Sequence, residues 1–356
     1  MAAAGGLLGT VLLAAGAVCL NSGCSTIGFY AQAASGHLGV LARARPVPEV
    51  LAEAATSPTL RQRLELSQRI RDFASAELAL PDNNSYRRYA DLQRDAVVWN
   101  VVAAPALSLT LKTWCFPVMG CVGYRGYFAR DAAERLAGDL RGAGWEAAVY
   151  GVPAYSTLGW SAWGGGDPLL NTFVNWPESE LARLIFHELA HQVAYAADDT
   201  TFNESFAVAV ERLGGQRWLD RFASDAVRAQ NQALEARRRD FRAFTQRWRD
   251  NLQTLYSSAA NDADKLQQKT QLMADMRAEY GRLKTERWGG YAGYDSWIEK
   301  ANNASFGVLA AYNELVPQFE DLFLRSGNDF PRFYAAVREL AALPKDERRA
   351  KLAAPQ

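Results

Sequence analysis

The chain has 356 residues, of which 49% are hydrophobic, so it can form a sizeable core and is not globally disordered. Its 39 Lys and Arg residues balance its 39 Asp and Glu residues. A net charge of zero argues against a dedicated nucleic-acid-binding protein, which normally carries a basic excess. Only three histidines occur, so a site that uses imidazole must draw on few positions.

The first predicted element is a signal peptide over residues 1–23. Residues 7–20 form an uncharged apolar run, shorter than the roughly 20 residues that a transmembrane helix needs. The run ends in Leu-Asn-Ser-Gly-Cys24, which resembles a bacterial lipobox, although Asn21 replaces the preferred Leu. We therefore expect a lipid on Cys24 that anchors the protein on the periplasmic side of the bacterial envelope, at the inner or the outer membrane. The alternative is an ordinary cleaved signal peptide or a weak membrane anchor.

The first half of the mature chain predicts a mixture of helices and strands. Ser57 and Pro58 are typical of a helix start, and the apolar spacing that follows extends this helix to about Leu80. Further along, the patterns predict a loop over residues 81–85, strands over 97–103, 107–116 and 146–150, a helix over 131–141 and a short strand over 155–160.

Cys115 and Cys121 lie within this half and are separated by five residues that include Pro117 and Gly120. These residues predict a turn that can bring the two sulfur atoms together. Export to an oxidising compartment favours a disulfide between them, whereas two reduced thiols in the core are the alternative.

Two of the three histidines lie in the sequence His187-Glu188-Leu-Ala-His191. Histidines four residues apart on a helix project from the same face, so their imidazoles can bind one metal ion. Glu188 leaves the helix about 100° away, where it can contact a metal-bound water without being a ligand. Asn175 is the predicted N-cap of this helix, with Pro177 in its first turn. The alternative is a pair of histidines on an ordinary helix that binds no metal.

A catalytic zinc ion normally has three protein ligands and one open position. The third histidine, His37, lies far upstream and is a poor ligand candidate, so the third ligand should be a carboxylate or a thiolate. The cysteines also lie far upstream. Residues 198–202 are expected to break the first helix, and a second helix over 203–213 can then run back beside it. Glu204 would lie in the first turn of this second helix and face the histidines.

The remainder of the chain predicts almost only helices. From Val227 to Leu255, and again from Leu266 to Leu283, apolar residues recur at steps of three and four. The polar residues 257–262 between them predict a turn, so the two segments are expected to form a long antiparallel helical hairpin. The predicted fold class is therefore α+β and mostly α-helical.

The arrangement of histidines and Glu204 resembles the gluzincin metallopeptidases, whose second helix carries the motif Asn-Glu-x-x-Ala. Here the motif reads Asn203-Glu204-Ser-Phe-Ala207 and matches at every fixed position. Together with the lipobox, residues 155–160, 167–172 and 302–304 resemble a bacterial family of predicted aminopeptidases over nearly the whole chain. The resemblance implies a zincin-like catalytic core, Zn²⁺ as cofactor, a peptide as substrate and aminopeptidase activity.

The predicted organisation follows the chain. After the signal peptide, the predicted parts are a membrane-proximal segment over 24–56, an α+β zincin-like part with the zinc helices over 57–216, the helical hairpin over 217–288 and a C-terminal helical part over 289–356 that completes the catalytic domain.

The expected chemistry is hydrolysis of a peptide bond by a zinc-activated water, with Glu188 as the general base. A second donor should stabilise the oxyanion beside the zinc ion. The scarcity of histidine leaves Tyr, Asn or Arg for this role, and Tyr294, Tyr155 and Asn303 are the candidates, each of which can also be purely structural. Residues 155–158 are the best strand for holding the backbone of a substrate.

The leading hypothesis is therefore a zinc-dependent peptidase of the bacterial envelope. An aminopeptidase needs an acidic group for the α-ammonium of its substrate, and Glu211, about two turns beyond Glu204, is one option. The alternative is a non-catalytic envelope lipoprotein with a structural zinc ion and a helical protein-interaction surface. Structural zinc sites usually have four ligands and are rich in Cys, so three ligands beside Glu188 favour catalysis.

Overall fold

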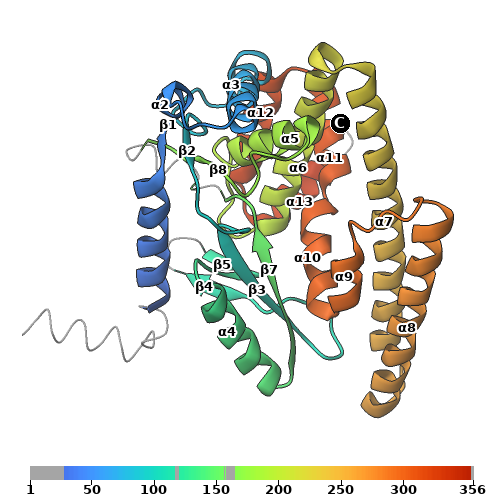
Figure 1. Cartoon of the computed structure of the whole chain (residues 1–356). Coiled ribbons are helices and arrows are strands. Elements are labelled where there is room, and N and C mark those ends of the chain that lie inside the picture. Colours follow the sequence, from blue (N-terminus) through green and yellow to red (C-terminus); the bar gives the residue numbers. More distant parts are fainter. Residues whose placement is uncertain (1–27, 117–119, 156, 158–164, 354–356) are drawn as a thin grey trace, which may run out of the picture.

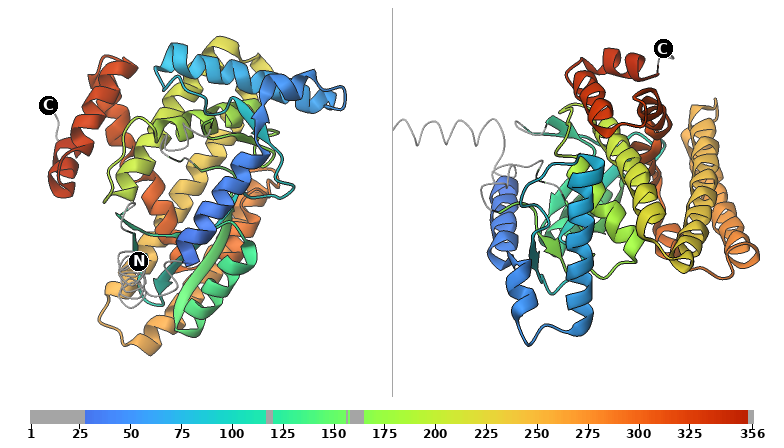
Figure 2. Two further views of the ribbon diagram at one scale, coloured as in Figure 1. Left: turned by 90° about the vertical axis from the view of Figure 1, so that its left-hand side faces the viewer. Right: turned by 90° about the horizontal axis from the view of Figure 1, so that it is seen from above.

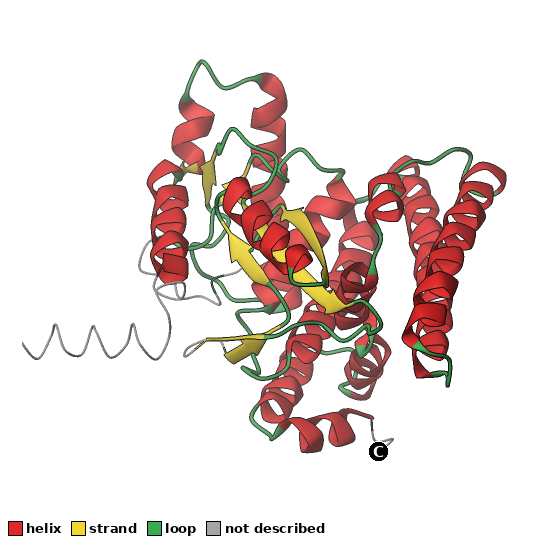
Figure 3. Cartoon of the chain, turned by 90° about the horizontal axis from the view of Figure 1, so that it is seen from below, coloured by secondary structure: helices red, strands yellow, loops and turns green. Residues whose placement is uncertain are grey.

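The computed structural model describes residues 28–116, 120–155, 157 and 165–353. The predicted signal peptide and Cys24 lie outside these residues, as do most positions of the strand predicted over 155–160. Within the described part of the chain, no helix is both long and apolar enough to span a membrane. The predicted α+β, mostly helical class is confirmed, with short strands gathered near the middle of the molecule (Figures 1 and 3).

Residues 28–43 form a helix, and the labelled elements follow it along the chain. In order they are β1 (Arg45–Pro46), α2 (Val47–Ala52), α3 (Pro58–Leu78), β2 (Arg88–Ala90), β3 (Val98–Pro105), β4 (Trp114–Phe116), β5 (Gly120–Val122), β6 (Arg125–Tyr127), α4 (Arg130–Gly142), β7 (Trp145–Val152), β8 (Leu169–Leu170), α5 (Glu178–Ala190), α6 (Thr200–Phe222), α7 (Asp225–Ser257), α8 (Asp262–Glu286), α9 (Asp295–Lys300), α10 (Asn303–Asn313), α11 (Val316–Arg325), α12 (Phe330–Ala341) and α13 (Lys345–Ala353).

The strands form three small sheets. β3 is the central strand of one sheet, in the order β6-β3-β7, and pairs antiparallel with both neighbours. α4 covers one face of this sheet, because its Ala133 and Ala137 pack against Val101 of β3. A second sheet has the order β1-β2-β8. β4 and β5 form a two-stranded sheet in which a disulfide joins the paired residues Cys115 and Cys121.

The prediction of one strand over residues 107–116 is wrong. Only β4 is a strand, and the residues before it turn back along β3, where the Lys112 N–H donates to the Ala103 carbonyl at 2.7 Å. Leu107 and Leu109 pack against helices instead, and Leu111 packs between β3, β7 and α10. Leu109 is buried in a core cluster with residues of α7, α8 and α10, so its apolar character reflects contact with helices and not one face of a sheet.

α5 and α6 pack against each other in the largest core cluster, and α3, α10 and α11 contact this pair. Phe186 of α5 and Phe202 and Phe206 of α6 are fully buried there. Burial of one such side chain stabilises the fold by about 1.5–3 kcal/mol relative to leaving it exposed. The two helices that carry the sequence motifs therefore lie in the best-packed part of the molecule.

The predicted ends of these two helices need correction. Pro177, not Asn175, immediately precedes α5, and no side chain of the described residues caps this end. Residues 173–176 still form turns, so the chain becomes helical only after the proline. α6 begins at Thr200, earlier than predicted, because Asp199 accepts a hydrogen bond from the Phe202 N–H and caps the helix. Glu204 consequently lies in the second turn of α6 and not in the first.

α7 and α8 lie side by side, are joined by residues 258–261 and extend along one flank of the body (Figures 1 and 2). Their apolar stripes form a separate core cluster with α9 and α10. Phe241 and Trp248 come from α7, and Met276 and Tyr280 come from α8. The spacing of apolar residues that predicted these helices therefore marks the faces that they bury.

Candidate metal centre

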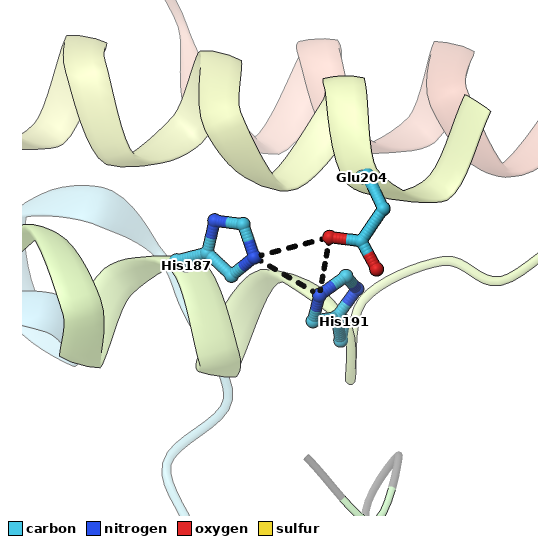
Figure 4. Close-up of side chains that lie close together, drawn as sticks. All are labelled: His187, His191 and Glu204. Atoms are coloured by element: carbon cyan, nitrogen blue, oxygen red, sulfur yellow. Dashed lines mark hydrogen bonds and ion pairs between the residues drawn. The ribbon is translucent and has the colours of Figure 1, made fainter. Parts of the chain in front are cut away.

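Three predicted ligands converge at one point between α5 and α6 (Figure 4). His187 lies in the last turn of α5, His191 is the C-cap residue of this helix, and Glu204 projects from α6. The Nε2 atoms of the two histidines are 3.2 Å apart. Glu204 Oε2 lies 3.5 Å from His187 Nε2 and 3.7 Å from His191 Nε2. All three side chains are nearly buried, with 10–13% of each side chain exposed.

The spacing and the chemistry of these atoms fit a zinc ion. Ligand atoms held tetrahedrally at about 2.0–2.2 Å from zinc lie roughly 3.3–3.6 Å apart, which is close to the three separations observed. His187 Nδ1 lies 2.9 Å from a carboxylate oxygen of Glu211, which favours the tautomer with the proton on Nδ1 and with Nε2 available to a metal ion. Burial would lower the pKa of His187, but the carboxylates of Glu204 and Glu211 outweigh burial and raise it, so a cation bound between these atoms would take the place of a proton.

Glu211 emerges as the residue that orients His187. It lies seven residues after Glu204 on α6, so both carboxylates project from the same face of the helix. Arg183 lies 2.7 Å from Glu211 and also pairs with Glu235 of α7. Burial alone would raise the pKa of Glu211, but Arg183 and His187 together lower it to about 2. The sequence analysis weighed Glu211 only as a contact for the substrate, although its spacing from Glu204 indicated a shared face.

Glu188 is buried beside the ligands and is 7% exposed. Burial raises the pKa of Glu188 to about 7; the carboxylates of Glu204 and Asp167 add to this rise, and His187 opposes it. Burial lowers the pKa of His191 to about 4; the Glu204 carboxylate acts to raise this pKa, and His187 acts to lower it further. His191 is therefore neutral at pH 7, which is the protonation state that binds metals.

Asn203, the first residue of the Asn-Glu-x-x-Ala motif, holds the connection between the two helices. Its Oδ1 accepts from the Ala196 N–H at 2.8 Å, and its Nδ2 donates to the Ala196 carbonyl at 2.7 Å. Asn203 is buried, and these two hydrogen bonds give both its amide oxygen and its amide nitrogen a partner on the backbone. The motif residue before Glu204 thus fixes the short connection that brings α6 back beside α5.

A loop over residues 83–86 lies against the end of α5. Asn83 Nδ2 donates to Gln192 Oε1 at 2.8 Å, and Gln192 Nε2 donates to Ser85 Oγ at 3.2 Å. The buried guanidinium of Arg71 holds this loop by donating to the Asn83 and Ser85 carbonyls, each at 2.9 Å, and to the carbonyl of the preceding Pro81 at 2.6 Å. Sequence reasoning did not find these residues, because Gln192 lies more than 100 positions from its two partners.

Two of the predicted oxyanion donors are engaged elsewhere. Tyr294 stacks on Phe241 with ring centroids 3.8 Å apart, inside the core cluster of α7, α8 and α10. Asn303 is fully buried, and its side chain accepts from Tyr256 Oη at 2.7 Å and donates to the Pro105 and Ala106 carbonyls at 2.9 Å. The structure therefore assigns both side chains to packing and does not bring them to the three converging ligands.

Tyr155, the third predicted donor, lies nearer to the centre. Its hydroxyl is 2.5 Å from His37 Nδ1. Burial raises the pKa of Tyr155, and the Asp167 carboxylate, which also acts on Glu188, raises it further. His37 thus reaches the surroundings of the site from the helix over residues 28–43, although it is not one of the converging ligands. The sequence analysis had set His37 aside as a metal ligand, and the converging group of described residues does not include it.

The charge of Glu204 acts on three tyrosines that the sequence analysis did not single out. They are Tyr124, Tyr150 and Tyr195. Burial raises the pKa of each phenol, and the Glu204 carboxylate raises it further in all three cases. The Tyr150 hydroxyl accepts a hydrogen bond from Asn100 Nδ2 at 3.4 Å, which lowers its pKa in part.

A protein-family model described as "Putative aminopeptidase" matches residues 28–352 of the chain. The chain belongs to this aminopeptidase family. The match covers the candidate metal centre and nearly all of the residues that the structure describes. Membership of the family supports a peptidase activity. A search of curated proteins and a search of solved structures each returned no match.

Proposed function

We propose that this member of the aminopeptidase family is a zinc-dependent peptidase. The observation that carries the proposal is the convergence of His187, His191 and Glu204, with Glu188 buried next to them on the same helix. A site closed for structure would use a fourth protein ligand, whereas only three ligand groups converge within the described residues. When bound, a zinc ion would supply Lewis-acid activation of water and of the peptide carbonyl.

The side chains around the ion would orient a ligand and transfer protons. Glu211 keeps His187 in the tautomer that presents Nε2, because it accepts the proton of Nδ1. Glu188 takes a proton from the attacking water and transfers it to the leaving amine. Its position is fixed because it lies on a fully packed helix between the two histidines. The zincin-like character of this core is part of the same proposal.

The Glu188→Gln variant tests the reaction. The amide keeps the size of the side chain but cannot accept the proton, so hydrolysis should fall by about 10²–10⁴-fold while zinc binding stays stoichiometric. Glu178→Gln, on the first turn of the same helix, is the matched control and should retain activity, because the amide oxygen can still accept from Trp218 Nε1. Full hydrolysis by zinc-loaded Glu188→Gln would contradict the proposed mechanism.

Cleavage at the N-terminus of the substrate is the second part of the proposal, and the family description supports it. Peptides with a free and with an acetylated N-terminus should be compared on the zinc-loaded protein. We expect stepwise release of N-terminal residues from the free peptides only. Internal cleavage of the blocked peptides would contradict the aminopeptidase assignment and leave the peptidase assignment intact.

We also propose that a lipid on Cys24 anchors the protein to the bacterial envelope on its periplasmic side; the support is the sequence that ends at this cysteine. In cells fed a labelled fatty acid, the wild-type protein should carry the label and Cys24→Ser should not. Equal labelling of the two proteins, or no labelling of either, would contradict the anchor.

A further inference from the structure

A cavity of about 320 Å³ lies between α6 and α7. This volume is at the lower end of the range for sites that bind small molecules. Its lining residues on each helix include positions four apart, which share one helix face, so the cavity is formed by two facing helix surfaces. They include Arg212 and Gln216 of α6, and Asn231, Glu235 and Arg239 of α7.

Arg183 of α5 also lines this cavity and reaches it beside Gly215 of α6. A Cβ atom at Gly215 would lie 2.8 Å from Arg183 Cγ, so the glycine leaves room for the stem of this arginine. The Arg183 guanidinium pairs with Glu211 at 2.7 Å and also with Glu235, and the second oxygen of Glu211 contacts His187. Glu211 therefore separates Arg183 from the converging ligands, and the cavity is distinct from the metal centre.

The lining of the cavity carries three guanidinium groups and one carboxylate. The carboxylate belongs to Glu235, and Arg183 and Arg238 neutralise it, with Arg238 at 2.8 Å. Arg212 lies 3.4 Å from Glu320 of α11 in a pair that is partly exposed. Arg239 is exposed and makes no hydrogen bond or ion pair with any residue that the structure describes. Positive charge is therefore in excess at the cavity, and the Arg239 guanidinium is available to a ligand.

The charges next to the cavity agree with this excess. Burial lowers the pKa of Arg242, three residues after Arg239 on α7, and the neighbouring arginines lower it further while Glu235 opposes them. Burial would raise the pKa of Glu235, but Arg183 and Arg238 outweigh burial and lower it, so this carboxylate remains ionised and paired. An added anion would therefore be stabilised in this cavity, whereas an added cation would be repelled.

We propose that the cavity between α6 and α7 binds a small oxyanion, a phosphate or a carboxylate group, with Arg239 as its main contact. A guanidinium group donates paired N–H groups that match the geometry of such ions, and hydrogen bonds between charged groups are the stronger ones. Arg212 and Arg183 supply further positive charge, and the Gln232 amide, which also lines the cavity, can add a neutral donor. The site does not depend on the proposed peptidase function.

Titration calorimetry of the zinc-loaded protein with inorganic phosphate, at a fixed ionic strength of about 0.1 M, tests the site. The wild type should bind phosphate saturably with a Kd of about 1 mM or below. In Arg239→Gln the Kd should rise by about 10–100-fold, as for loss of a charged hydrogen bond, while the midpoint of urea unfolding stays unchanged because Arg239 is exposed.

Arg237→Gln is the matched control. It removes the same charge two residues away, on the opposite side of α7, where the guanidinium lies over the Tyr291 ring. Its Kd for phosphate should stay within about threefold of the wild-type value.

A second variant tests the place of binding and not the charge. Gln216 is exposed and lines the cavity, so Gln216→Trp keeps every arginine but fills the space with an indole ring. The Kd for phosphate should rise about tenfold or more. Gln253→Trp, at an exposed position of α7 outside the cavity, is its control and should leave the Kd unchanged. Titration with succinate in place of phosphate then shows which of the two groups the site prefers.

The outcomes separate this site from the metal centre. Phosphate held by the zinc ion would bind equally well to wild type, Arg239→Gln and Gln216→Trp, and this result would overturn the oxyanion site and leave the peptidase function standing. An equal loss of affinity in Arg239→Gln and Arg237→Gln would show a general effect of charge and would also overturn it. So would a wild-type protein that binds neither phosphate nor succinate saturably.

Discussion

At the scale of single residues, carboxylates shape the candidate centre as much as histidines do. Glu204 completes the set of converging ligands, and Glu211 fixes the imidazole of His187. Arg183 then holds Glu211 in place and connects it to Glu235 on α7. The orientation of one ligand thus depends on a chain of charged groups that reaches a third helix.

The first prediction concerns Glu211→Gln. The amide cannot accept the Nδ1 proton as a carboxylate does, and its own N–H favours the tautomer of His187 that protonates Nε2. We expect the affinity for zinc to weaken by about 10–100-fold, measured by competition with a chromophoric chelator. Glu320→Gln is the control. Glu320 lies on α11 and pairs with Arg212 of α6, and its substitution should leave zinc affinity unchanged. An unaltered zinc affinity in Glu211→Gln would contradict the assigned role.

At the scale of elements, the start of α6 connects the metal centre to the last helix of the chain. Asp199 caps α6 and is 1% exposed. Its carboxylate lies 3.1 Å from Arg348 and 2.5 Å from Arg349, both on α13. The same carboxylate therefore fixes the beginning of the helix that carries Glu204 and holds α13 against it.

The second prediction is that Asp199→Asn destabilises the fold by about 3 kcal/mol, because it leaves two arginines without their buried counter-charge. The amide oxygen still accepts from the Phe202 N–H, so the loss measures the ion pairs and not the cap. Urea unfolding measures the difference. Asp321→Asn, which alters an exposed pair with Arg325, should cost no more than about 1 kcal/mol. Equal losses in the two variants would contradict the importance of this contact.

The third prediction concerns pH. Burial alone would raise the pKa of Asp199, but the hydrogen bonds from Arg349 and the Phe202 N–H and the nearby charges outweigh burial and lower it. The folded-state pKa thus lies below the unfolded value of about 3.9, so this stabilisation is complete above that value and is lost as the pH falls through the folded-state pKa. The difference in unfolding free energy between wild type and Asp199→Asn should shrink below about pH 4. A constant difference would exclude the charge of Asp199 as its cause.

Sequence patterns predicted most helices and the three converging ligands, because periodicity and fixed motif spacing are local properties. They failed for residues 107–116, where the leucines contact helices that come more than 100 residues later. They also failed for the start of α6, where Asp199 caps the helix within the segment that was expected to break it. Gln192 escaped notice because its contacts with Asn83 and Ser85 are not revealed by any spacing within one helix.

At the scale of the whole molecule, the centre is assembled from segments that are distant in sequence. α5 and α6 supply the ligands, and the loop held by Arg71 supports the end of α5. The largest core cluster, which runs from Val40 to Leu352, packs around α5 and α6. The affinity for the metal is therefore expected to depend on the folding of most of the chain.

X-ray absorption at the zinc K-edge of the purified full-length protein tests the central claim most directly. The account predicts one zinc ion per chain with nitrogen and oxygen ligands at about 2.0–2.2 Å, two of them imidazoles, and no sulfur ligand. In Glu204→Gln, the zinc content should drop while the fold persists. A sulfur shell at about 2.3 Å, more than two imidazoles, or a protein that retains no zinc at neutral pH would contradict the account.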